Sequence, residues 1–574
     1  MSQAGADAGR SEVRRAALAA LLLGLFWSVP MAPERAWGWD ESMHAELPAV
    51  RMLLAAQDGE LGAALGVLHD CGQYPFLWPL ALACVQSISG VSELACRVAG
   101  TWAWCFALFG LFLLGRELVA AQRGPDGAAR RGDDLAPWLA MGLGALCPLA
   151  LAYSGTLFLE VPFAAVSVWS LRAWLRRDGR PSRELSAGAW LAAAFFTKFN
   201  YALLLAFGCS LDWAVEGALA ARRGGLIRHL LRGAWLAAIP GLALLWWLVL
   251  PLPAGSEVAA RHREALLDFL GGNLDLAPTP WGVRALHWAA FFALTARLLA
   301  LQLAGAAAAL REVARPGARL LWLVLLGAGL PVWLHPFHLD RFLIPSGPAL
   351  WALAALGLAR ALPAAPGRRG AALAAFGLLA LAFPGLDARL VSARLCPAPA
   401  SADIRASQLQ TFRGWRELGP RRPLPTGPSL ARAERDRLLD LVAAAVGPGE
   451  RLGWLGLSSE LSPAAVHLGL FARAGSRQRF RRDAHRPMDV ALEGADPGWD
   501  DARLQEFASG FDAILVTSPP DLRERAARAF IRGYQERLVG TLGWQAASVG
   551  TIELSRPGRD PLPVRVYLCR PPQR

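Results

Sequence analysis

Residues 187–216 read AGAWLAAAFFTKFNYALLLAFGCSLDWAVE, a largely apolar run that Lys198 interrupts near its middle. About 20 apolar residues are enough to cross the hydrocarbon layer of a membrane. We read this run as two short spans, residues 187–198 and 199–216, that meet at the lysine. Lys198 is the one lysine among 59 lysine and arginine residues. This position therefore indicates a need for a compact ammonium group and not a guanidinium, although a lysine that snorkels to the membrane surface is the simpler alternative.

The same length criterion predicts further spans along the first two thirds of the chain, about eleven in all. The first apolar run, residues 16–33, follows three arginines and could be a signal peptide, but Pro30 and Pro33 spoil a small-residue cleavage site. We therefore expect a retained first helix. Residues 74–90 are apolar but short and contain Pro75 and Pro79, so they predict a re-entrant or surface-lying segment. The remaining predicted spans are residues 93–115, 136–153, 161–176, 233–253, 283–307, 319–334, 342–360 and 370–387.

The arginines predict the orientation of these spans, because cytoplasmic loops are enriched in positive residues. With the N-terminus in the cytoplasm, the loops on that side hold arginine groups near residues 116–131, 172–183, 222–232, 311–319 and 360–369. The opposite side then receives residues 36–92, 154–160, 254–282, 335–341 and everything after about 388. The first exoplasmic loop, residues 36–92, is the longest before the C-terminal part.

Composition supports a membrane protein. Hydrophobic residues make up 54% of the chain and charged residues 18%, an apolar excess over ordinary soluble domains. The net charge of +13 comes from arginines in short loops between apolar runs, which is not the pattern of a nucleic-acid groove. The eight cysteines include no CxxC pair, so we expect them to be small apolar fillers.

The tail differs from the rest of the chain, and we divide the protein into residues 1–390, a transmembrane module, and residues 391–574, a soluble α/β domain outside the cytoplasm. Short apolar strands are predicted at residues 451–457, 511–517 and 564–568. Amphipathic helices are predicted at residues 462–474 and 521–538. The proline- and arginine-rich residues 419–428 predict an irregular connection.

Four polar clusters lie on the predicted exoplasmic side. Asp40 and Glu41, with His44, directly follow the first span; adjacent carboxylates suit general-base work or metal binding, and a solvated helix start is the alternative. Glu160 lies between two spans, where an ionisable group is costly and therefore a functional candidate, or an interfacial acid that reaches water. Lys198 is the third. His335, His338 and Arg341 form the fourth, in which the arginine can hold a phosphate by two hydrogen bonds.

The order of these features resembles the C-type (GT-C) membrane glycosyltransferases, which use polyprenyl-phosphate sugars. The shared features are Asp-Glu after the first span, the proline-opened segment QYPFLWP at residues 73–79, an acid before a proline at Glu160, Thr-Lys at residues 197–198, and RFLIP at residues 341–345. The chain is similar to the dolichyl-phosphate-mannose protein mannosyltransferases and the bacterial lipid A aminoarabinose transferases. Glu160 stands where an aspartate is frequent in the family.

The resemblance implies transfer of a sugar from a polyprenyl-phosphate carrier, with inversion, on the exoplasmic or periplasmic side of a bacterial inner membrane. It implies Asp40 as the base, Glu41 and Glu160 as residues that position acceptor or sugar, and Lys198 and Arg341 as ligands of the donor phosphate. His44, Tyr74 and Pro75 would line the substrate groove. Some relatives hold a divalent cation, for which Asp40, Glu160, His335 and His338 are the candidate ligands. The implied partners are the lipid-linked donor, membrane lipid, and a lipid, glycan or protein acceptor, with no nucleic acid.

Two other classes of function are open from the sequence. A polytopic transporter or flippase for a lipid-linked or small anionic substrate would also bury charges between helices, but it predicts charges at mid-span and a repeated half. A non-catalytic scaffold, with the tail as a binding module, would not require four polar clusters on one side of the membrane.

Overall fold

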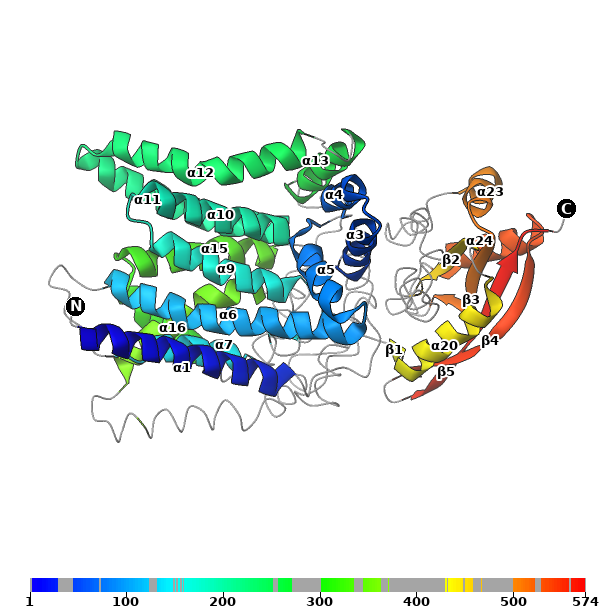
Figure 1. The fold of residues 1–574 in the computed structure, drawn as a ribbon, viewed down its shortest axis with the longest axis horizontal. Coiled ribbons are helices and arrows are strands. Elements are labelled where there is room, and N and C mark those ends of the chain that lie inside the picture. The colour runs from blue at the N-terminus through cyan, green and yellow to red at the C-terminus, as the bar shows by residue number, and fades with distance from the viewer. Residues whose placement is uncertain are drawn as a thin grey trace.

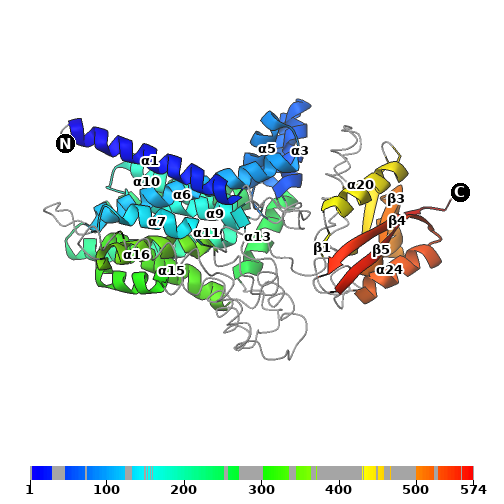
Figure 2. The same ribbon diagram turned by 90° about the horizontal axis from the view of Figure 1, so that it is seen from below.

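The computed structural model describes most of the chain in separate stretches (Figure 1). The described residues are 3–28, 45–71, 74–122, 132–147, 150, 153–154, 157, 159–250, 256–270, 301–334, 344–362, 370, 429–430, 432–447, 450–457, 466, 499–521, 528–556 and 559–572. The N-terminal part is a helical bundle and the C-terminal part is built on a β-sheet. Figures 1 and 2 show the sheet beyond one end of the bundle, with the N-terminus at the other end.

The bundle helices overlap the predicted spans that lie in the described residues, although the first helix begins at Gln3 and not at residue 16. Lengthwise helices of the bundle are α1 (Gln3–Ser28), α6 (Glu93–Gln122), α7 (Ala136–Ala145), α9 (Glu160–Leu175), α10 (Pro181–Thr197), α11 (Phe199–Arg222), α12 (Leu226–Leu248), α15 (Pro316–Leu334) and α16 (Gly347–Ala361). Among the described residues, three helices are long and apolar enough to cross a membrane on length and composition: Leu94–Gln122, Phe199–Arg222 and Leu226–Leu248. The predicted spans at residues 283–307 and 370–387 lie largely outside the described residues.

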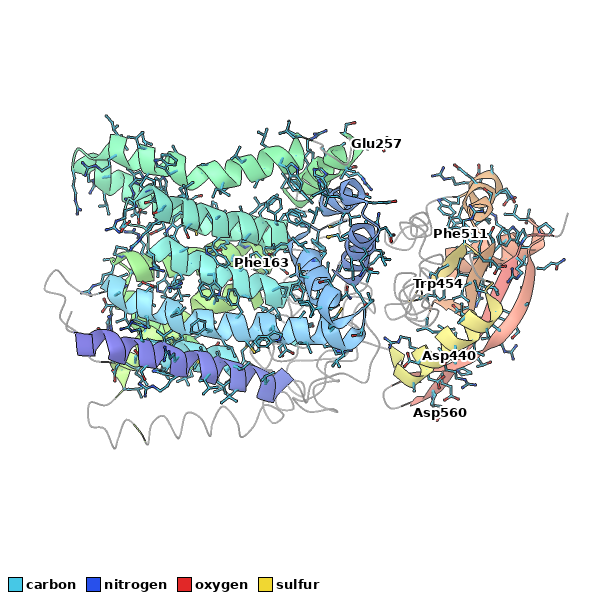
Figure 3. The ribbon with its side chains drawn as sticks, viewed as in Figure 1. Phe163, Glu257, Asp440, Trp454, Phe511 and Asp560 are labelled. Atoms are coloured by element: carbon cyan, nitrogen blue, oxygen red, sulfur yellow. The ribbon has the colours of Figure 1, made fainter. Side chains whose placement is uncertain are left out.

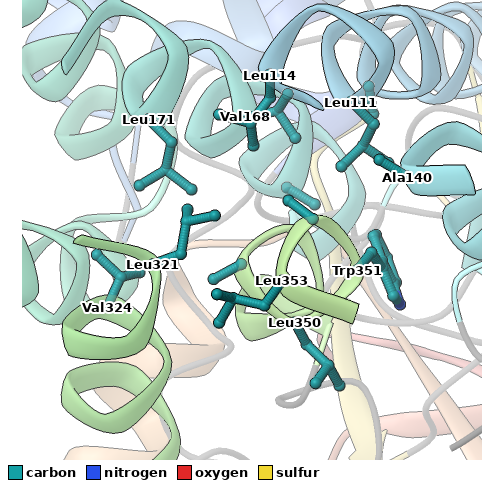
Figure 4. Packing of buried hydrophobic residues seen from close by; sticks show 14 of the residues in the cluster. Leu111, Leu114, Ala140, Val168, Leu171, Leu321, Val324, Leu350, Trp351 and Leu353 are labelled. Atoms are coloured by element: carbon teal, nitrogen blue, oxygen red, sulfur yellow. The ribbon is translucent and has the colours of Figure 1, made fainter. Parts of the chain in front are cut away.

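Apolar side chains from every lengthwise helix of the bundle contribute to its interior. Figure 4 shows Leu111 and Leu114 of α6 facing Val168 and Leu171 of α9, with Leu321 of α15 below them. Trp351 and Leu353 of α16 and Ala140 of α7 belong to the same cluster. Small residues let some helices approach closely, as is common between membrane helices: a Cβ on Gly208 of α11 would come 2.6 Å from the Cα of Val324 in α15.

Three short helices cap the end of the bundle that faces the sheet. They are α3 (Leu47–Gln57), α4 (Leu61–His69) and α5 (Leu77–Ser89), and Figure 1 shows them together between the bundle and the sheet. Their own core includes Ala49, Trp78 and Leu82, together with Leu157 and Leu159 from the segment that leads into α9. Helix α5 covers most of the segment that the sequence predicts as re-entrant or surface-lying. A fourth peripheral helix, α13 (Ser256–Leu270), follows α12 at this end.

The C-terminal part contains a five-stranded sheet with the strand order β1-β4-β5-β3-β2. Strands β2 and β3 are parallel, and the other neighbours are antiparallel. One face packs on α20 (Arg432–Ala445) through a cluster that includes Leu438 and Trp454, and the other packs on α23 (Asp501–Ser509) and α24 (Arg528–Gly540) around Phe511 (Figure 3). The strands are β1 (Ser429–Leu430), β2 (Leu452–Leu457), β3 (Ala513–Asp521), β4 (Gln545–Arg556) and β5 (Arg559–Arg570).

The three predicted strands of the tail correspond to β2, β3 and β5, whereas β4 and the helices α20 and α23 were not predicted. The prediction that a helix begins at Asp521 was wrong, because this residue ends β3, where it pairs with Leu457; the helix is described from Arg528 onward. The predicted helix at residues 462–474 lies outside the described residues, apart from Val466.

Candidate active site

Lys198 forms the single-residue break between α10 and α11. Its backbone is extended, with φ −158° and ψ 99°, so it ends one helix and caps the next. Tyr74, just before α5, lies over its ammonium group, so the side chain is at the end of the bundle that carries the short helices. The side chain turns into the protein, and Lys198 is only 4% exposed. It therefore does not reach out to solvent as a snorkelling lysine would.

Glu160 is the first residue of α9 and is 1% exposed. A carboxylate in the first turn of a helix is stabilised by the unpaired backbone N–H groups and the helix dipole. The segment before it is anchored by Trp78 of α5, whose indole Nε1 donates a hydrogen bond to the carbonyl oxygen of Leu157 at 3.3 Å. The packing of α5 on this segment therefore helps to fix the start of α9.

The two residues form a buried ion pair. Lys198 Nζ lies 2.8 Å from Glu160 Oε1, and the hydroxyl of Tyr201 donates to the same oxygen at 3.4 Å. The ammonium also lies over two aromatic rings, 4.5 Å from the centroid of Tyr201 and 5.0 Å from that of Tyr74. An ion pair between membrane helices is costly unless both charges are compensated, and here the carboxylate and the rings compensate the ammonium.

The structure thus brings together several of the predicted site residues. Glu160, Lys198 and Tyr74 meet, and Pro75 is buried directly beside Tyr74. The next residue, Phe76, packs on Phe196 of α10 at 4.8 Å between ring centroids. The loop that precedes α5 is therefore held against the α10–α11 junction. The other predicted site residues, Asp40, Glu41, His44, His335, His338 and Arg341, lie outside the described residues.

A second polar cluster at the same end of the bundle was not predicted. His262 of α13 stacks on Trp247 of α12 at 3.8 Å, and its Nδ1 lies 3.3 Å from the Trp247 carbonyl oxygen. His69 of α4 lies 4.9 Å from the His262 ring and 3.3 Å, through Nε2, from the carbonyl oxygen of Trp246. Burial lowers the pKa of His262 to about 4 and also lowers the pKa of His69. Two neutral histidines therefore join α4, α12 and α13. The tryptophan pair at the end of a span was the one signal in the sequence, because aromatic residues gather at membrane interfaces.

The chemistry of the described site is that of anion recognition. A lysine ammonium offers three donors and a full charge, and the rings beside it exclude water, which strengthens its attraction for an anion. The Glu160 carboxylate already accepts from Lys198 and Tyr201, so it suits positioning better than proton abstraction. Within the described stretches, no group of three or more His, Cys, Asp and Glu side chains could hold a metal ion.

Comparisons with known proteins give a relationship in fold. No family model matches the sequence, and no curated protein matches it. The fold is similar to that of ArnT, a lipid A aminoarabinose transferase of the C-type class, from Cupriavidus metallidurans. The crystal structure of ArnT bound to undecaprenyl phosphate aligns over 97% of this chain and 98% of its own, with 14% identity and a TM-score of 0.53. The apo structure aligns over 98% of both chains, with 17% identity and a TM-score of 0.52. The predicted resemblance to the C-type membrane glycosyltransferases is therefore confirmed for the fold.

Proposed function

We propose that this protein is a membrane glycosyltransferase that moves a sugar from a polyprenyl-phosphate carrier to an acceptor on the exoplasmic or periplasmic side, with inversion at the anomeric carbon. The observation that carries the proposal is the buried Lys198–Glu160 pair beside Tyr74, at the sheet-facing end of a bundle with the fold of ArnT. A buried ion pair between membrane helices costs free energy, and a binding site for an anionic donor would explain why the protein has one.

The reaction is a single displacement. Asp40 takes the proton of the acceptor hydroxyl, whose oxygen attacks the anomeric carbon of the sugar. The bond between that carbon and the phosphate oxygen breaks, and the polyprenyl phosphate leaves with the electron pair. The products are the glycosylated acceptor, the protonated base and the free lipid phosphate. Glu41 positions the acceptor or the sugar.

Negative charge grows on the phosphate as the bond breaks, and fixed cations there lower the barrier. We assign this role to Lys198 and Arg341. Glu160 holds the ammonium in place before the donor arrives, and the ammonium then faces two anions, the carboxylate and the phosphate. Support comes from the ArnT structure with undecaprenyl phosphate bound, since the chain shares that fold.

The loop and short helices from residue 45 to residue 90 form a cover over this end of the bundle, and we propose that the substrate groove runs beneath it, past His44, Tyr74 and Pro75. The Tyr74 ring over Lys198 supports this arrangement, because it links the cover directly to the phosphate-binding lysine. Movement of the cover would admit the donor and then exclude water from the reaction. We further propose about eleven spans, a cytoplasmic N-terminus, and residues 391–574 as an exoplasmic domain.

The test is mass spectrometry of lipid-linked sugars and surface glycans in cells with the intact gene, without it, and with the Asp40→Asn variant. A lost surface sugar together with an accumulated polyprenyl-phosphate sugar, in both the deletion and the Asp40→Asn cells, is the expected result. Unchanged glycans and lipid-linked sugars in the deletion would remove the proposal. An accumulated donor that is trapped on the cytoplasmic side of membrane vesicles would instead identify a flippase.

A further inference from the structure

We propose that the arginine-rich end of the bundle contains a binding site for the phosphate headgroup of an anionic membrane phospholipid. A cavity of about 500 Å³ lies there between α9, α11, α12 and α15, within the range of known ligand pockets. The turn between α11 and α12 lies at the end of the bundle opposite the sheet (Figure 1), so this cavity is separate from the Lys198–Glu160 site.

The inner wall of the cavity is a compensated network of charges. Arg319 Nε donates to Asp212 Oδ1 at 2.7 Å, and Trp174 Nε1 donates to Asp212 Oδ2 at 2.9 Å. Arg177, whose side chain is 2% exposed, lies 3.3 Å from Glu216. Charges buried with opposite partners need no ligand for their stability. The charged side chains of the inner wall are therefore held by one another and do not require a ligand.

Arg232 joins this network through Glu184, which also lies near Arg177. Its Nε donates to the fully buried Glu184 at 2.8 Å, and its guanidinium also lies 5.8 Å from the Trp213 ring. Arg177, Arg319 and Arg232 are thus balanced by Asp212, Glu216 and Glu184. Any further arginine at the cavity adds uncompensated positive charge.

Arg223 and Arg228 supply that charge. Both are exposed and line the cavity, one at the end of α11 and the other in the first turn of α12. Within the described part of the chain, no ion pair joins either of them to an acid. Two guanidinium groups at the mouth of one cavity can grip a phosphate through paired hydrogen bonds. The charge of the site therefore indicates an anionic ligand.

The surroundings of the cavity favour a lipid over a free anion. Leu219 lines the cavity and belongs to a stripe along α11 with Leu211 and Val215, all of them exposed. On the other side of the turn, Leu226 and Ile227 are exposed beside Arg228. A ligand with a phosphate and acyl chains would occupy the charged cavity and this apolar stripe together, whereas free phosphate would occupy only the cavity. Basic pockets between membrane helices are known to bind anionic headgroups in this way.

The test uses the full-length protein in a neutral detergent, with native mass spectrometry to measure binding of dioctanoyl phosphatidylglycerol, dioctanoyl phosphatidylcholine and inorganic phosphate. The variant Arg223→Gln/Arg228→Gln removes the two positive charges at the mouth of the cavity. The matched control, Arg14→Gln/Arg15→Gln, removes two exposed arginines from α1, whose N-terminus lies at the same end of the bundle. Because all four arginines are exposed, we expect both variants to unfold at the wild-type temperature in the absence of lipid.

The expected result is that phosphatidylglycerol binds wild type and the control alike and binds the cavity variant at least about tenfold more weakly, as the loss of charge-assisted hydrogen bonds to one phosphate predicts. Equal weakening in the control would mean attraction by general positive charge and would overturn the site. Equal binding of phosphatidylcholine would overturn the requirement for an anionic headgroup. Inorganic phosphate that binds as tightly as phosphatidylglycerol would overturn the lipid as ligand. None of these measurements depends on sugar transfer.

Discussion

The ammonium nitrogen of Lys198 lies 2.8 Å from Oε1 of Glu160, and the two residues are 4% and 1% exposed. Their helices come from different parts of the chain, so the pair ties the start of α9 to the α10–α11 junction. Removing one partner leaves a buried charge without compensation, which is far more costly than removing both. The pair can therefore be tested separately for its role in stability and for its proposed role in binding the donor.

We expect Lys198→Met and Glu160→Gln each to lower the stability of the purified protein by about 3–5 kcal/mol. The double variant should recover most of that loss, because no buried charge remains. Thermal unfolding in detergent measures the difference. The control is Arg261→Gln/Asp70→Asn, a pair with a 3.0 Å contact whose side chains are 61% and 36% exposed; it should change stability by less than about 1 kcal/mol. Equal losses in the single and double variants would contradict a compensated buried pair.

Asp40→Asn should abolish sugar transfer without loss of protein in the membrane. A positioned general base contributes about 10²–10⁴-fold to the rate, and asparagine keeps the size of the side chain but cannot accept the proton. The measurement is transfer from a synthetic polyprenyl-phosphate sugar, normalised to folded protein. Glu264→Gln, at an exposed position in α13, is a control that should keep wild-type activity. Wild-type turnover by Asp40→Asn would remove Asp40 from the reaction.

Lys198 and Arg341 should act on the same phosphate, and their losses should not add. Lys198→Ala and Arg341→Ala should each weaken donor binding and slow transfer, and the double variant should lose less than the sum, as residues that work as one unit do. Lys198→Arg should fail to restore full activity, because its planar fork is larger and cannot fit between Glu160 and the rings of Tyr74 and Tyr201. A double-mutant cycle on transfer in detergent measures the coupling. Strictly additive losses, or a fully active Lys198→Arg enzyme, would separate the two residues.

The sequence predicted the helices of the bundle well, because each apolar run must satisfy its own backbone in a membrane. It also predicted that Glu160 and Lys198 share one side, from the alternation of the spans. It did not predict that they touch, since contact depends on the rotation of α9 and α11 about their axes. The same reason hides the contact between His69 and His262, whose rings lie 4.9 Å apart although they come from different helices.

The sheet was harder to predict than the bundle. Strands β3 and β5 are rich in buried aliphatic residues and were found, whereas β4 has the sequence QAASVGTIELSR, with small and polar residues in its first half. Its strand conformation comes from pairing with β5 along most of its length, an effect of tertiary context that local patterns miss. Asp521 was misassigned for a similar reason, because its pairing with Leu457 extends β3 past two prolines.

The C-terminus should lie outside the cytoplasm. The arginine-rich turns lie at the end of the bundle opposite the sheet (Figure 1), and positive loops stay in the cytoplasm. A phosphatase fused after residue 574 should therefore be active, and a reporter that works only in the cytoplasm should be silent at the same position. The same pair of reporters fused after Arg223, in the α11–α12 turn, is the matched control and should give the opposite result. Reversed signals would place the sheet in the cytoplasm and would overturn the sidedness of the proposed active site.

Acid should destabilise the protein through His262 and His69, which join α4 of the cover to α12 and α13. The pKa of His262 is lowered from 6.5 to about 4, mainly by burial, and the pKa of His69 is lowered for the same reason. Below pH 6.5 the unfolded chain binds protons that the folded protein refuses, so stability falls as the pH drops from 6.5 towards 4 and is unaffected above 6.5.

The unfolding temperature, measured from pH 8 to pH 5, should therefore be flat above about pH 7 and then fall by a few degrees. This range avoids the loss of stability at lower pH that involves Glu450 in the sheet domain, whose pKa is held below 4.5 by its hydrogen bonds with Arg570.

The variant His262→Phe keeps the stack on Trp247 but cannot titrate. Its unfolding temperature should therefore fall less steeply than that of wild type between pH 6.5 and pH 5, whatever its level at pH 8. Asp70 and Arg261 also act on the pKa of His262, in opposite directions and by less than burial does. The control variant Glu450→Gln leaves these groups unchanged and should keep the wild-type slope in this range. A wild-type curve that is flat down to pH 5, or a His262→Phe curve that is as steep as wild type, would show that the histidines do not cause the loss of stability in acid.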